Sequence, residues 1–203
     1  MTRSYRLGRR EDSAAATRQR ILDVATELMT ASGFHPVAID DIAAQAGTTR
    51  PTVYRHFGSK VGLFEAVAWN VLSAAGIARV DEARELADPL VALREFLRAN
   101  CRMFAEMGTR LSAALDVARH EPDIAQILDV TYYGRRIESI EQLTTRLVDA
   151  GHIKPEWTTE QVVDALVVLT NVETFESLNQ HRSRSWQQVA DRLFDMSGAF
   201  RTR

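Results

Sequence analysis

The residues best suited to chemistry lie in one short stretch near the N-terminus, AGTTRPTVYRHFGSK at residues 46–60. The stretch concentrates guanidinium, hydroxyl, phenol, imidazole and ammonium groups, which can bind base edges and phosphate oxygens. Val53 and Phe57 lie four residues apart within it, as neighbours on the buried face of a helix do. The spacing therefore predicts a short helix with one apolar side and one polar side.

Two helices are expected before this one. The first runs from about Ala14 to Ser32, with Ser13 as its cap and Gly33 placed to end it. Its apolar face consists of Ile21, Ala25, Leu28 and Met29. The segment AIDDIAAQAG then forms two helical turns, with acidic residues at the positive N-terminal end and a glycine after the last turn.

The polar helix has its own start and stop signals. Thr49 offers a side-chain oxygen as N-cap, Pro51 fits the first turn, where its missing N–H costs nothing, and Gly58 ends the helix. Ser59 is then placed to cap the following helix, which begins near Lys60. Two short helices joined around a glycine, the second with a polar outer face, are the pattern of a helix-turn-helix.

In such a motif the second helix presents its side chains to the major groove of DNA. Arg50, Thr52 and Arg55 are the candidates for base contacts, whereas Tyr54, His56 and Lys60 could reach phosphate oxygens. Taken singly, each arginine would more often be a solvated surface charge, and the tyrosine could serve the core alone. The whole candidate set for DNA binding is Thr49, Arg50, Pro51, Thr52, Tyr54, Arg55, His56 and Lys60.

The charge distribution agrees with a polyanionic partner for the N-terminal end. Residues 1–60 hold nine Lys and Arg against six Asp and Glu, whereas the rest of the chain holds 16 against 21. Before any acidic residue, a segment without hydrophobic periodicity carries Arg3, Arg6, Arg9 and Arg10. We therefore expect residues 1–12 to be a flexible arm, which either follows a DNA minor groove or remains a solvated tail.

The composition of the whole chain favours an all-α protein. Of its 203 residues 45% are hydrophobic, five are proline and ten are glycine, and no long alternating run of Val, Ile and Thr indicates a strand. The N-terminus has no apolar signal-peptide core, and no apolar run of about 18 residues could cross a bilayer. A cytoplasmic location is expected.

Catalytic and metal chemistry find no support in the sequence. Cys101 is the only cysteine, which excludes an internal disulfide and a zinc site of paired thiolates; its ordinary role is that of a small buried hydrophobe. The five histidines show no spacing that would gather them around a metal. No Gly-rich phosphate loop or nucleophile motif occurs. We expect no cofactor, no metal and no enzymatic activity.

Residues 17–67 resemble the N-terminal DNA-binding domain of the TetR family of transcriptional regulators. The resemblance rests on an ordered series of motifs: I-x-x-x-A-x-x-L-M, GF, D-I-A-x-x-A-G, T-x-Y-x-H-F and S-K. It implies a three-helix DNA-binding head within residues 13–60 and a linking helix at 61–80. It also implies a variable helical body at 81–203 that binds a small effector, in a homodimer.

The chain departs from the family pattern in two places. Val37 and Ala38 stand where Thr-Thr or Thr-Ser is frequent, so the second helix loses its side-chain cap, at a cost of about 1 kcal/mol. Arg50 and Pro51 stand where Lys-Gly is frequent in the polar helix. The second departure concerns the operator sequence and not the fold.

Start and stop signals divide the body into five or so helices, which makes about nine in the whole chain. The expected helices begin at Asp88-Pro89, Thr109, the break at residues 121–123, Thr158 and Ser185, and the first three end near Met107, His120 and Ala150. The last two helices each open with a capping box, Thr158-x-x-Gln161 and Ser185-x-x-Gln188.

The last two helices carry more apolar surface than one subunit would cover. The segment between Val162 and Val172 is apolar around most of its circumference. The final helix carries one stripe, made of Trp186, Ala190, Leu193, Ser197 and Phe200. We expect the two helices to form a two-fold four-helix bundle with a second copy, with Leu193 and Phe200 at the interface; a monomeric core is the alternative.

Large adaptable side chains and a few polar groups in the body are candidates for an effector site. The candidate set is Trp69, Asn100, Met103, Phe104, Met107, His120, Tyr132, Tyr133, Asn171 and Phe175, with Phe96, Trp157 and Glu173 as further members. Each of these residues could instead be ordinary core or surface. Asn171 and Glu173 stand out because they interrupt an apolar helix.

Two functions remain open on this evidence. The favoured one is a DNA-binding regulator, a repressor released from a palindromic operator by a small molecule. The alternative is a helical small-molecule binding or enzymatic protein in which the DNA-binding head is vestigial.

Overall fold

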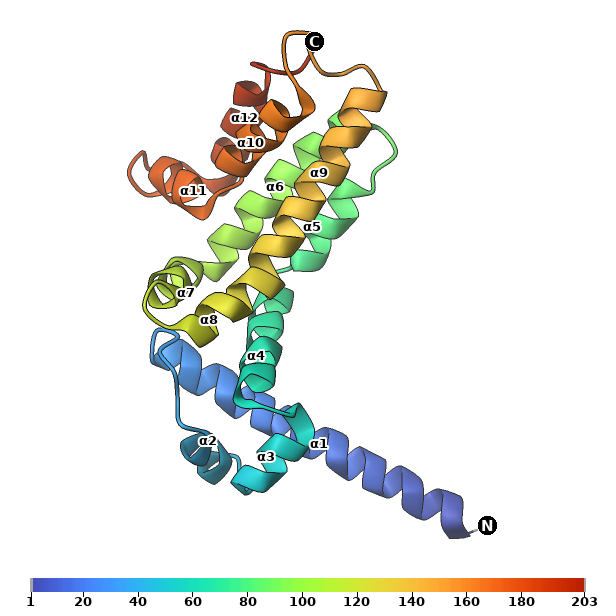
Figure 1. The fold of residues 1–203 in the computed structure, drawn as a ribbon, viewed down its shortest axis with the longest axis vertical. Helices are drawn as coiled ribbons and strands as arrows, with labels where there is room; N and C mark the ends of the chain where they lie inside the picture. Colours follow the sequence, from blue (N-terminus) through green and yellow to red (C-terminus); the bar gives the residue numbers. More distant parts are fainter. Residues whose placement is uncertain (1, 203) are drawn as a thin grey trace. The chain divides into compact units, whose positions relative to one another are not determined.

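The computed structural model describes the backbone of residues 2–202 and the side chains of residues 13–202. Within this range the chain is all-α, as predicted, and consists of helices α1 to α12 with one π-helical segment, η1 (Figure 1). The bounds are α1 Thr2–Ala31, α2 Ile39–Gln45, α3 Arg50–Phe57, α4 Lys60–Ala74, α5 Ile77–Arg84, α6 Pro89–Met107, α7 Arg110–Ala118, α8 Pro122–Leu128, η1 Asp129–Tyr133, α9 Gly134–Asp149, α10 Thr159–Leu169, α11 Val172–Asn179 and α12 Trp186–Ser197.

The structure has more helices than the sequence predicted, because three expected helices are interrupted. The linking helix ends at Ala74, and Gly76, with φ 82°, turns the chain into α5. The long helix before Ala150 contains the π-helical turn η1 between α8 and α9. The helix that opens at Thr158 stops at Thr170, after which Asn171 is the N-cap residue of α11.

The first helix is longer than expected. It begins at Thr2, so its backbone is helical where the sequence indicated a flexible arm, and Ser13 lies inside the helix and does not cap it. The side chains of residues 1–12 lie outside those described, and their contact with DNA stays a prediction. The helix ends where expected, before Gly33.

The chain divides into two compact units, Met1–Val71 with Ala113–Leu128, and Leu72–Ser112 with Asp129–Arg203. In the first unit α1 packs against α2 and α3. The apolar core there includes Ile21, Ala25, Ile42 and Val53, each fully buried. The Nε of Arg20 donates to the carbonyl of Ala46 at 2.9 Å and ties α1 to the end of α2. Short helices are thereby held by a long one.

Phe57 is less buried than the sequence predicted. It is half-buried, and the guanidinium of Arg18 on α1 lies 4.7 Å from its ring centroid. A ring at the edge of the core gains attraction from a cation over its face, which full burial would not allow. Val53 alone therefore anchors α3 deep in the core.

In the second unit α6 is the central helix. It packs against α5, α9, α11 and α12, and α5 also packs against α9 (Figure 1). Its buried residues include Leu93, Phe96, Leu97 and Phe104. Cys101 is buried on the same helix, as expected, and burial raises the pKa of its thiol to about 12, so the side chain stays protonated and serves as a hydrophobe.

The capping signals of the body are confirmed. Asp88 caps α6 by accepting hydrogen bonds from the backbone N–H groups of Leu90 and Val91, at 2.8 and 3.2 Å. Both predicted capping boxes are present, at Thr158 for α10 and at Ser185 for α12. These caps fix where the body helices begin.

The apolar stripe of α12 does not face a second copy. Ala190, Leu193, Ser197 and Phe200 are buried within the same chain, and α12 packs against α6. Replacing Leu193 or Phe200 with Glu would therefore disrupt the subunit itself and cannot serve as a test of dimerisation. The large apolar side chains exposed on the last helices are instead Val168 on α10 and Met196 on α12, with 62% and 54% of their surface exposed.

Within the described residues, no single helix is both long and apolar enough to cross a membrane. Helices α4 and α5 together have the length and the composition of a membrane-spanning segment, but the chain bends by 68° at the break between them.

The cap of α6 provides a test of how this fold is stabilised. Asp88→Ala should lower the free energy of unfolding by about 1 kcal/mol, because the first-turn N–H groups lose their acceptor. Asp88→Asn keeps a side-chain acceptor and is the matched control, which should lose clearly less. Urea denaturation followed by circular dichroism measures both; an equal loss would show that charge, and not the cap bond, stabilises this end.

Candidate functional site

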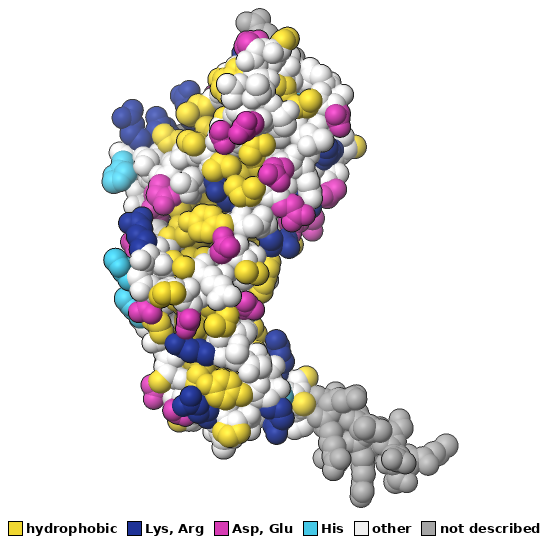
Figure 2. Space-filling model, viewed as in Figure 1, with side chains coloured by type: hydrophobic (Ala, Val, Ile, Leu, Met, Phe, Trp, Pro, Cys, Tyr) yellow, Lys and Arg dark blue, Asp and Glu magenta, His cyan; other side chains and the backbone are white. Residues whose placement is uncertain are grey.

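The polar helix α3 displays most of its predicted DNA-contacting residues on one outer face. Arg50, Pro51 and Arg55 are exposed, while Val53 on the opposite side is fully buried. Thr52, Tyr54 and His56 are half-buried along the edges of this face. Figure 2 shows Lys and Arg side chains, in dark blue, beside exposed hydrophobic ones on the part of the molecule that holds α2 and α3.

Thr49 occupies the N-cap position of α3, but the predicted cap bond is absent. Its hydroxyl lies 3.1 Å from the hydroxyl of Thr52, and its side chain accepts no bond from the first-turn backbone. Pro51 lies in the first turn, as predicted. The entry into α3 is therefore fixed by the proline and by packing more than by a capping side chain.

Arg50 is held between α2 and α3. Its Nη1 lies 3.0 Å from Oδ2 of Asp40, its Nη2 donates to the hydroxyl of Tyr54 at 3.2 Å, and its guanidinium carbon lies 5.5 Å from the Tyr54 ring centroid. The hydrogen bond to Tyr54 and the nearby Asp40 carboxylate raise the pKa of Arg50. Both ends of the ion pair are exposed, so the pair orients the guanidinium more than it stabilises the fold.

Asp40 is a functional candidate that sequence reasoning missed. The sequence indicates only an acidic residue at the positive end of α2. The structure places Asp40 against Arg50, the leading candidate for a base contact. The two residues are ten positions apart and meet only because the turn of the helix-turn-helix folds α3 back onto α2. Knowledge of the motif's three-dimensional turn would have been needed to find the pair.

Lys60 is positioned at the start of α4. Its Nζ lies 3.8 Å from a carboxylate oxygen of Asp123 on α8 and 5.5 Å from the ring centroid of Phe64. Ser59 caps the helix as predicted, because its hydroxyl accepts the Gly62 N–H at 2.9 Å. A phosphate bound here would compete with Asp123 for the ammonium group.

The second unit contains a cavity of about 30 Å³ between α5, α6, η1 and α9. Of the residues proposed for an effector site, the cavity is lined by Phe96, Asn100, Met103 and Tyr132. The sequence missed other lining residues, among them Asp81, Arg135 and Ser139. Nothing in the sequence indicates that α5 packs on α9, so sequence reasoning could not bring these polar residues together.

The remaining effector candidates lie elsewhere. Phe104 and Phe175 pack on each other in the core, with ring centroids 5.6 Å apart. Met107, three residues after Phe104 on α6, is also buried. Asn171 is the half-buried N-cap residue of α11 and Glu173 is exposed in its first turn, so both mark a helix break. Of the others, Tyr133 is 41% exposed with its ring centroid 5.2 Å from that of Tyr132, Trp157 packs on Phe200, and Trp69 and His120 belong to the first unit.

Among the residues that the structure describes, no group of three or more His, Cys, Asp or Glu side chains is placed to hold a metal ion. The features that the structure does assemble are a helix-turn-helix with an exposed polar second helix and a helical body with a small, partly open cavity. Together they define a class of protein, the DNA-binding regulators of the helix-turn-helix type.

Comparisons with known proteins match the N-terminal part of the chain to one family of regulators. Residues 21–67 match the model of the bacterial regulatory proteins, tetR family. The transcriptional regulator AcrR of Shigella flexneri is 39% identical over 90 residues, which are 43% of this chain and 41% of AcrR, so the match spans less than half of that relative's length. Residues 21–67 therefore carry the DNA-binding domain typical of the tetR family of bacterial regulatory proteins.

Solved structures share the fold over nearly the whole chain. SmeT, in a complex with triclosan, aligns with a TM-score of 0.68 and 17% identity, covering 92% of each chain. The TetR family regulator PfmR from Thermus thermophilus aligns with a TM-score of 0.57 and 24% identity, covering 88% of this chain and 96% of PfmR. The fold of this chain is therefore similar to that of proteins whose sequences are at most 24% identical to it.

The pairing of Arg50 with Asp40 leads to a test of how the base-reading side chain is positioned. Asp40→Ala should lower the ratio of affinities for a selected and a scrambled duplex by about twofold to fivefold, the worth of an exposed ion pair. Asp41→Ala removes the same charge one residue away without a contact to Arg50 and should leave the ratio unchanged. Fluorescence anisotropy with a duplex selected from a random pool measures both. Equal effects of the two substitutions would contradict a positioning role for Asp40.

Proposed function

We propose that the protein is a transcriptional repressor that binds a palindromic operator as a homodimer and releases it when a small molecule occupies the body. The observation that carries the proposal is the exposed polar face of α3, anchored by buried Val53, within the stretch that matches the family model. Regulation of this kind would take place in the cytoplasm. The direct test is selection of a duplex from a random pool, followed by measurement of its affinity.

The side chains on and beside α3 have separable roles in this proposal. Arg50 carries a planar fork of donors that matches the O6 and N7 atoms of guanine, and Asp40 and Tyr54 orient that fork. Lys60 carries a point charge at a helix N-terminus, where phosphate binding is favoured. Base contacts would determine the sequence that is read, and phosphate contacts would determine the register on the duplex.

Features of the body support the proposal of a small-molecule effector. The body contains a small, partly open cavity with both apolar and polar walls, the usual composition of a ligand site. SmeT, which shares the fold, was solved as a complex with triclosan. By analogy, the body of this chain would receive a small molecule as well, and the bound state would disfavour the spacing of the two heads that fits the operator.

The homodimer would form through α10 and α12. Val168 and Met196 leave large apolar side chains exposed on these helices, and an open hollow of about 360 Å³ beside Trp157 and Val168 lies along α10. An isologous contact of two copies would cover such a surface.

Replacement of the DNA-contacting residues should separate base reading from phosphate binding. Arg50→Ala should weaken binding to the selected duplex by about 1–3 kcal/mol and change binding to scrambled DNA little. Lys60→Ala should weaken both alike and reduce the magnitude of the log–log salt slope by about one per head, because one fewer counterion is released. Tyr54→Phe should act as a milder form of Lys60→Ala.

Anisotropy titrations on both duplexes at several salt concentrations measure these effects. If Arg50→Ala weakened both duplexes equally while Lys60→Ala changed only the selected one, the assigned roles would be reversed. If none of the three substitutions changed binding, the DNA-reading surface would lie elsewhere.

The dimer can be tested with exposed residues in place of the buried stripe. Val168→Glu and Met196→Glu should each raise the dimer dissociation constant by about tenfold or more, because a charge would be buried without a partner at the interface. Val130→Glu is the matched control, since Val130 is 57% exposed on η1, away from α10 and α12. Sedimentation velocity measures dissociation, and circular dichroism confirms that the variants are folded. A monomeric unmutated chain at micromolar concentration would refute the proposed dimer.

A further inference from the structure

One buried polar group that lines the cavity of the second unit has no hydrogen-bond partner. Among the described residues, the buried side-chain atoms without a partner are Arg79 Nε, Tyr132 Oη, Thr144 Oγ1 and Arg184 Nη1, and of these residues only Tyr132 lines the cavity. Its side chain is 95% buried. A buried hydroxyl without a partner is unfavourable, and proteins seldom retain one without a use.

The other polar side chains of the cavity wall are already satisfied. The amide of Asn100 donates to the carbonyl of Phe96 at 2.8 Å, and the hydroxyl of Ser139 accepts from Arg84 at 3.1 Å. The charged residues of the wall are partnered too: Arg135 with Asp81 at 2.7 Å, and Arg136 with the backbone carbonyls of Thr170 and Val167. Thr131 also has a partner. The hydroxyl of Tyr132 is the group left to receive a ligand.

The backbone at Tyr132 is unusual as well. Residues Asp129–Tyr133 form the π-helical turn η1, a conformation that is rare and is often found at functional sites. The turn buries Thr131 and Tyr132 on one side, while Val130 and Tyr133 remain exposed. The π-helical turn thus buries Tyr132 and leaves Tyr133 exposed. The sequence alone does not distinguish these two adjacent tyrosines.

We infer that this cavity is the effector site and that the effector is a compact, uncharged, mainly apolar molecule with one hydrogen-bond acceptor, which receives the proton of the Tyr132 hydroxyl. That the bound molecule acts as an effector rests on the proposed function. That a molecule of this kind binds in the cavity does not. Ile77, Val80, Phe96 and Met103 provide the apolar walls. The paired charges leave no unmatched ion to select a charged ligand.

The ionisation state of the tyrosine agrees with a donor role. Burial raises the pKa of Tyr132, with the nearby Tyr133 and Glu173 acting in the same direction and Arg136 against it. The hydroxyl therefore keeps its proton at neutral pH and above. It can donate a hydrogen bond to a carbonyl or ether oxygen throughout the physiological range.

The cavity must enlarge before it can hold an organic molecule. Its volume of about 30 Å³ is about that of one water molecule in the liquid. The wall best able to move is α5, because it has eight residues, follows a glycine in the left-handed region and buries only Val80 and Ala83. Met103, on the wall formed by α6, has the flexible side chain that adapts most readily to a new shape.

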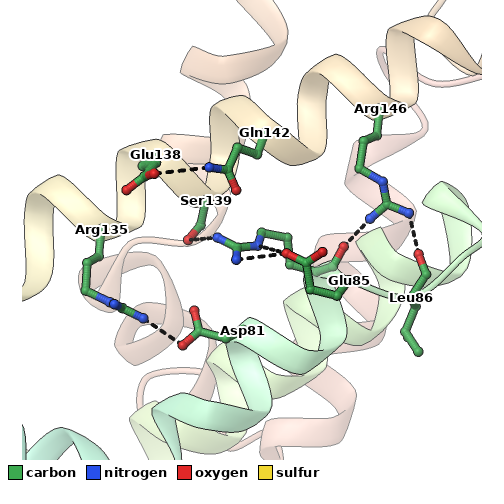
Figure 3. A network of polar contacts seen from close by, with 9 residues as sticks. Asp81, Glu85, Leu86, Arg135, Glu138, Ser139, Gln142 and Arg146 are labelled. Atoms are coloured by element: carbon green, nitrogen blue, oxygen red, sulfur yellow. Dashed lines mark hydrogen bonds and ion pairs between the residues drawn. The ribbon is translucent and has the colours of Figure 1, made fainter.

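Polar contacts join α5 to α9 along this wall (Figure 3). Arg135 pairs with Asp81, Ser139 accepts from Arg84, and Arg146 donates to the backbone carbonyls of Arg84 and Leu86. The Arg135 and Asp81 side chains are 43% and 33% exposed, and ion pairs of this exposure add little stability. They can break and form again as α5 moves, so the helix can act as the cover of the site.

Titration of the unliganded protein without DNA tests the inference, with two probes of nearly equal shape. Cyclohexanone has a carbonyl acceptor where methylenecyclohexane has an apolar methylene group, and cyclohexanecarboxylate adds a negative charge. Binding to the unmutated chain, Tyr132→Phe and Tyr133→Phe is followed by NMR chemical shifts of the protein. Tyr133→Phe is the matched control, because Tyr133 is the exposed neighbour that does not line the cavity.

We expect cyclohexanone to bind most tightly and cyclohexanecarboxylate not to bind. Tyr132→Phe should weaken cyclohexanone binding about threefold to tenfold, the worth of one hydrogen bond, and leave methylenecyclohexane binding unchanged. Tyr133→Phe should change neither. No saturable binding of cyclohexanone, preferential binding of the carboxylate, or equal losses in the two tyrosine variants would overturn the inference.

Thermal unfolding provides a second readout that needs no ligand. Tyr132→Phe should leave the midpoint unchanged or raise it, because the substitution removes a buried group without a partner. A lowered midpoint would show that the hydroxyl is bonded in the empty protein and would also overturn the inference. Failure of the proposed regulatory function would appear separately, as saturable cyclohexanone binding in a protein that selects no duplex.

Discussion

The packing of short helices against one long helix in each unit is the interaction on which the rest of the structure depends. Helices α2 and α3 have seven and eight residues, and isolated helices of that length are unstable in water. Their apolar side chains, above all Val53, are buried against α1, and this burial holds the polar face of α3 outward. In the second unit α6 has the same role for α5, α9, α11 and α12.

Polar contacts orient groups that this packing has already brought together. Arg50 with Asp40, and Arg135 with Asp81, are exposed ion pairs, which contribute little to the free energy of folding. They fix the direction of a guanidinium in one case and close the α5 wall of a cavity in the other. Contacts that are weak and partly solvated can also be exchanged for contacts to DNA or to a ligand, which suits a regulator more than a buried ion pair would.

Local signals in the sequence predicted much of the fold. The caps at Asp88, Thr158 and Ser185 and the apolar spacing around Val53 depend on neighbours within one helical turn, so they can be recognised without the fold. The breaks after Ala74 and at Asn171 were missed because a single glycine or asparagine is tolerated within a helix, so Gly76 and Asn171 alone do not indicate a break, and tertiary packing decides whether the chain turns there. The apolar stripe of α12 was recognised, but its partner was not: periodicity identifies a buried face without saying which surface covers it.

The sequence by itself determined the all-α class, the helix-turn-helix with its outward polar residues and the match of residues 21–67 to the tetR family, since each of these depends on residue types at short, fixed spacing. Only the tertiary structure decided that Asp40 meets Arg50, that Leu193 and Phe200 lie inside the subunit, and that Tyr132 has a buried hydroxyl without a partner. Those facts depend on contacts between residues far apart in the chain or on an unusual helical turn, and side-chain periodicity along one helix does not carry that information.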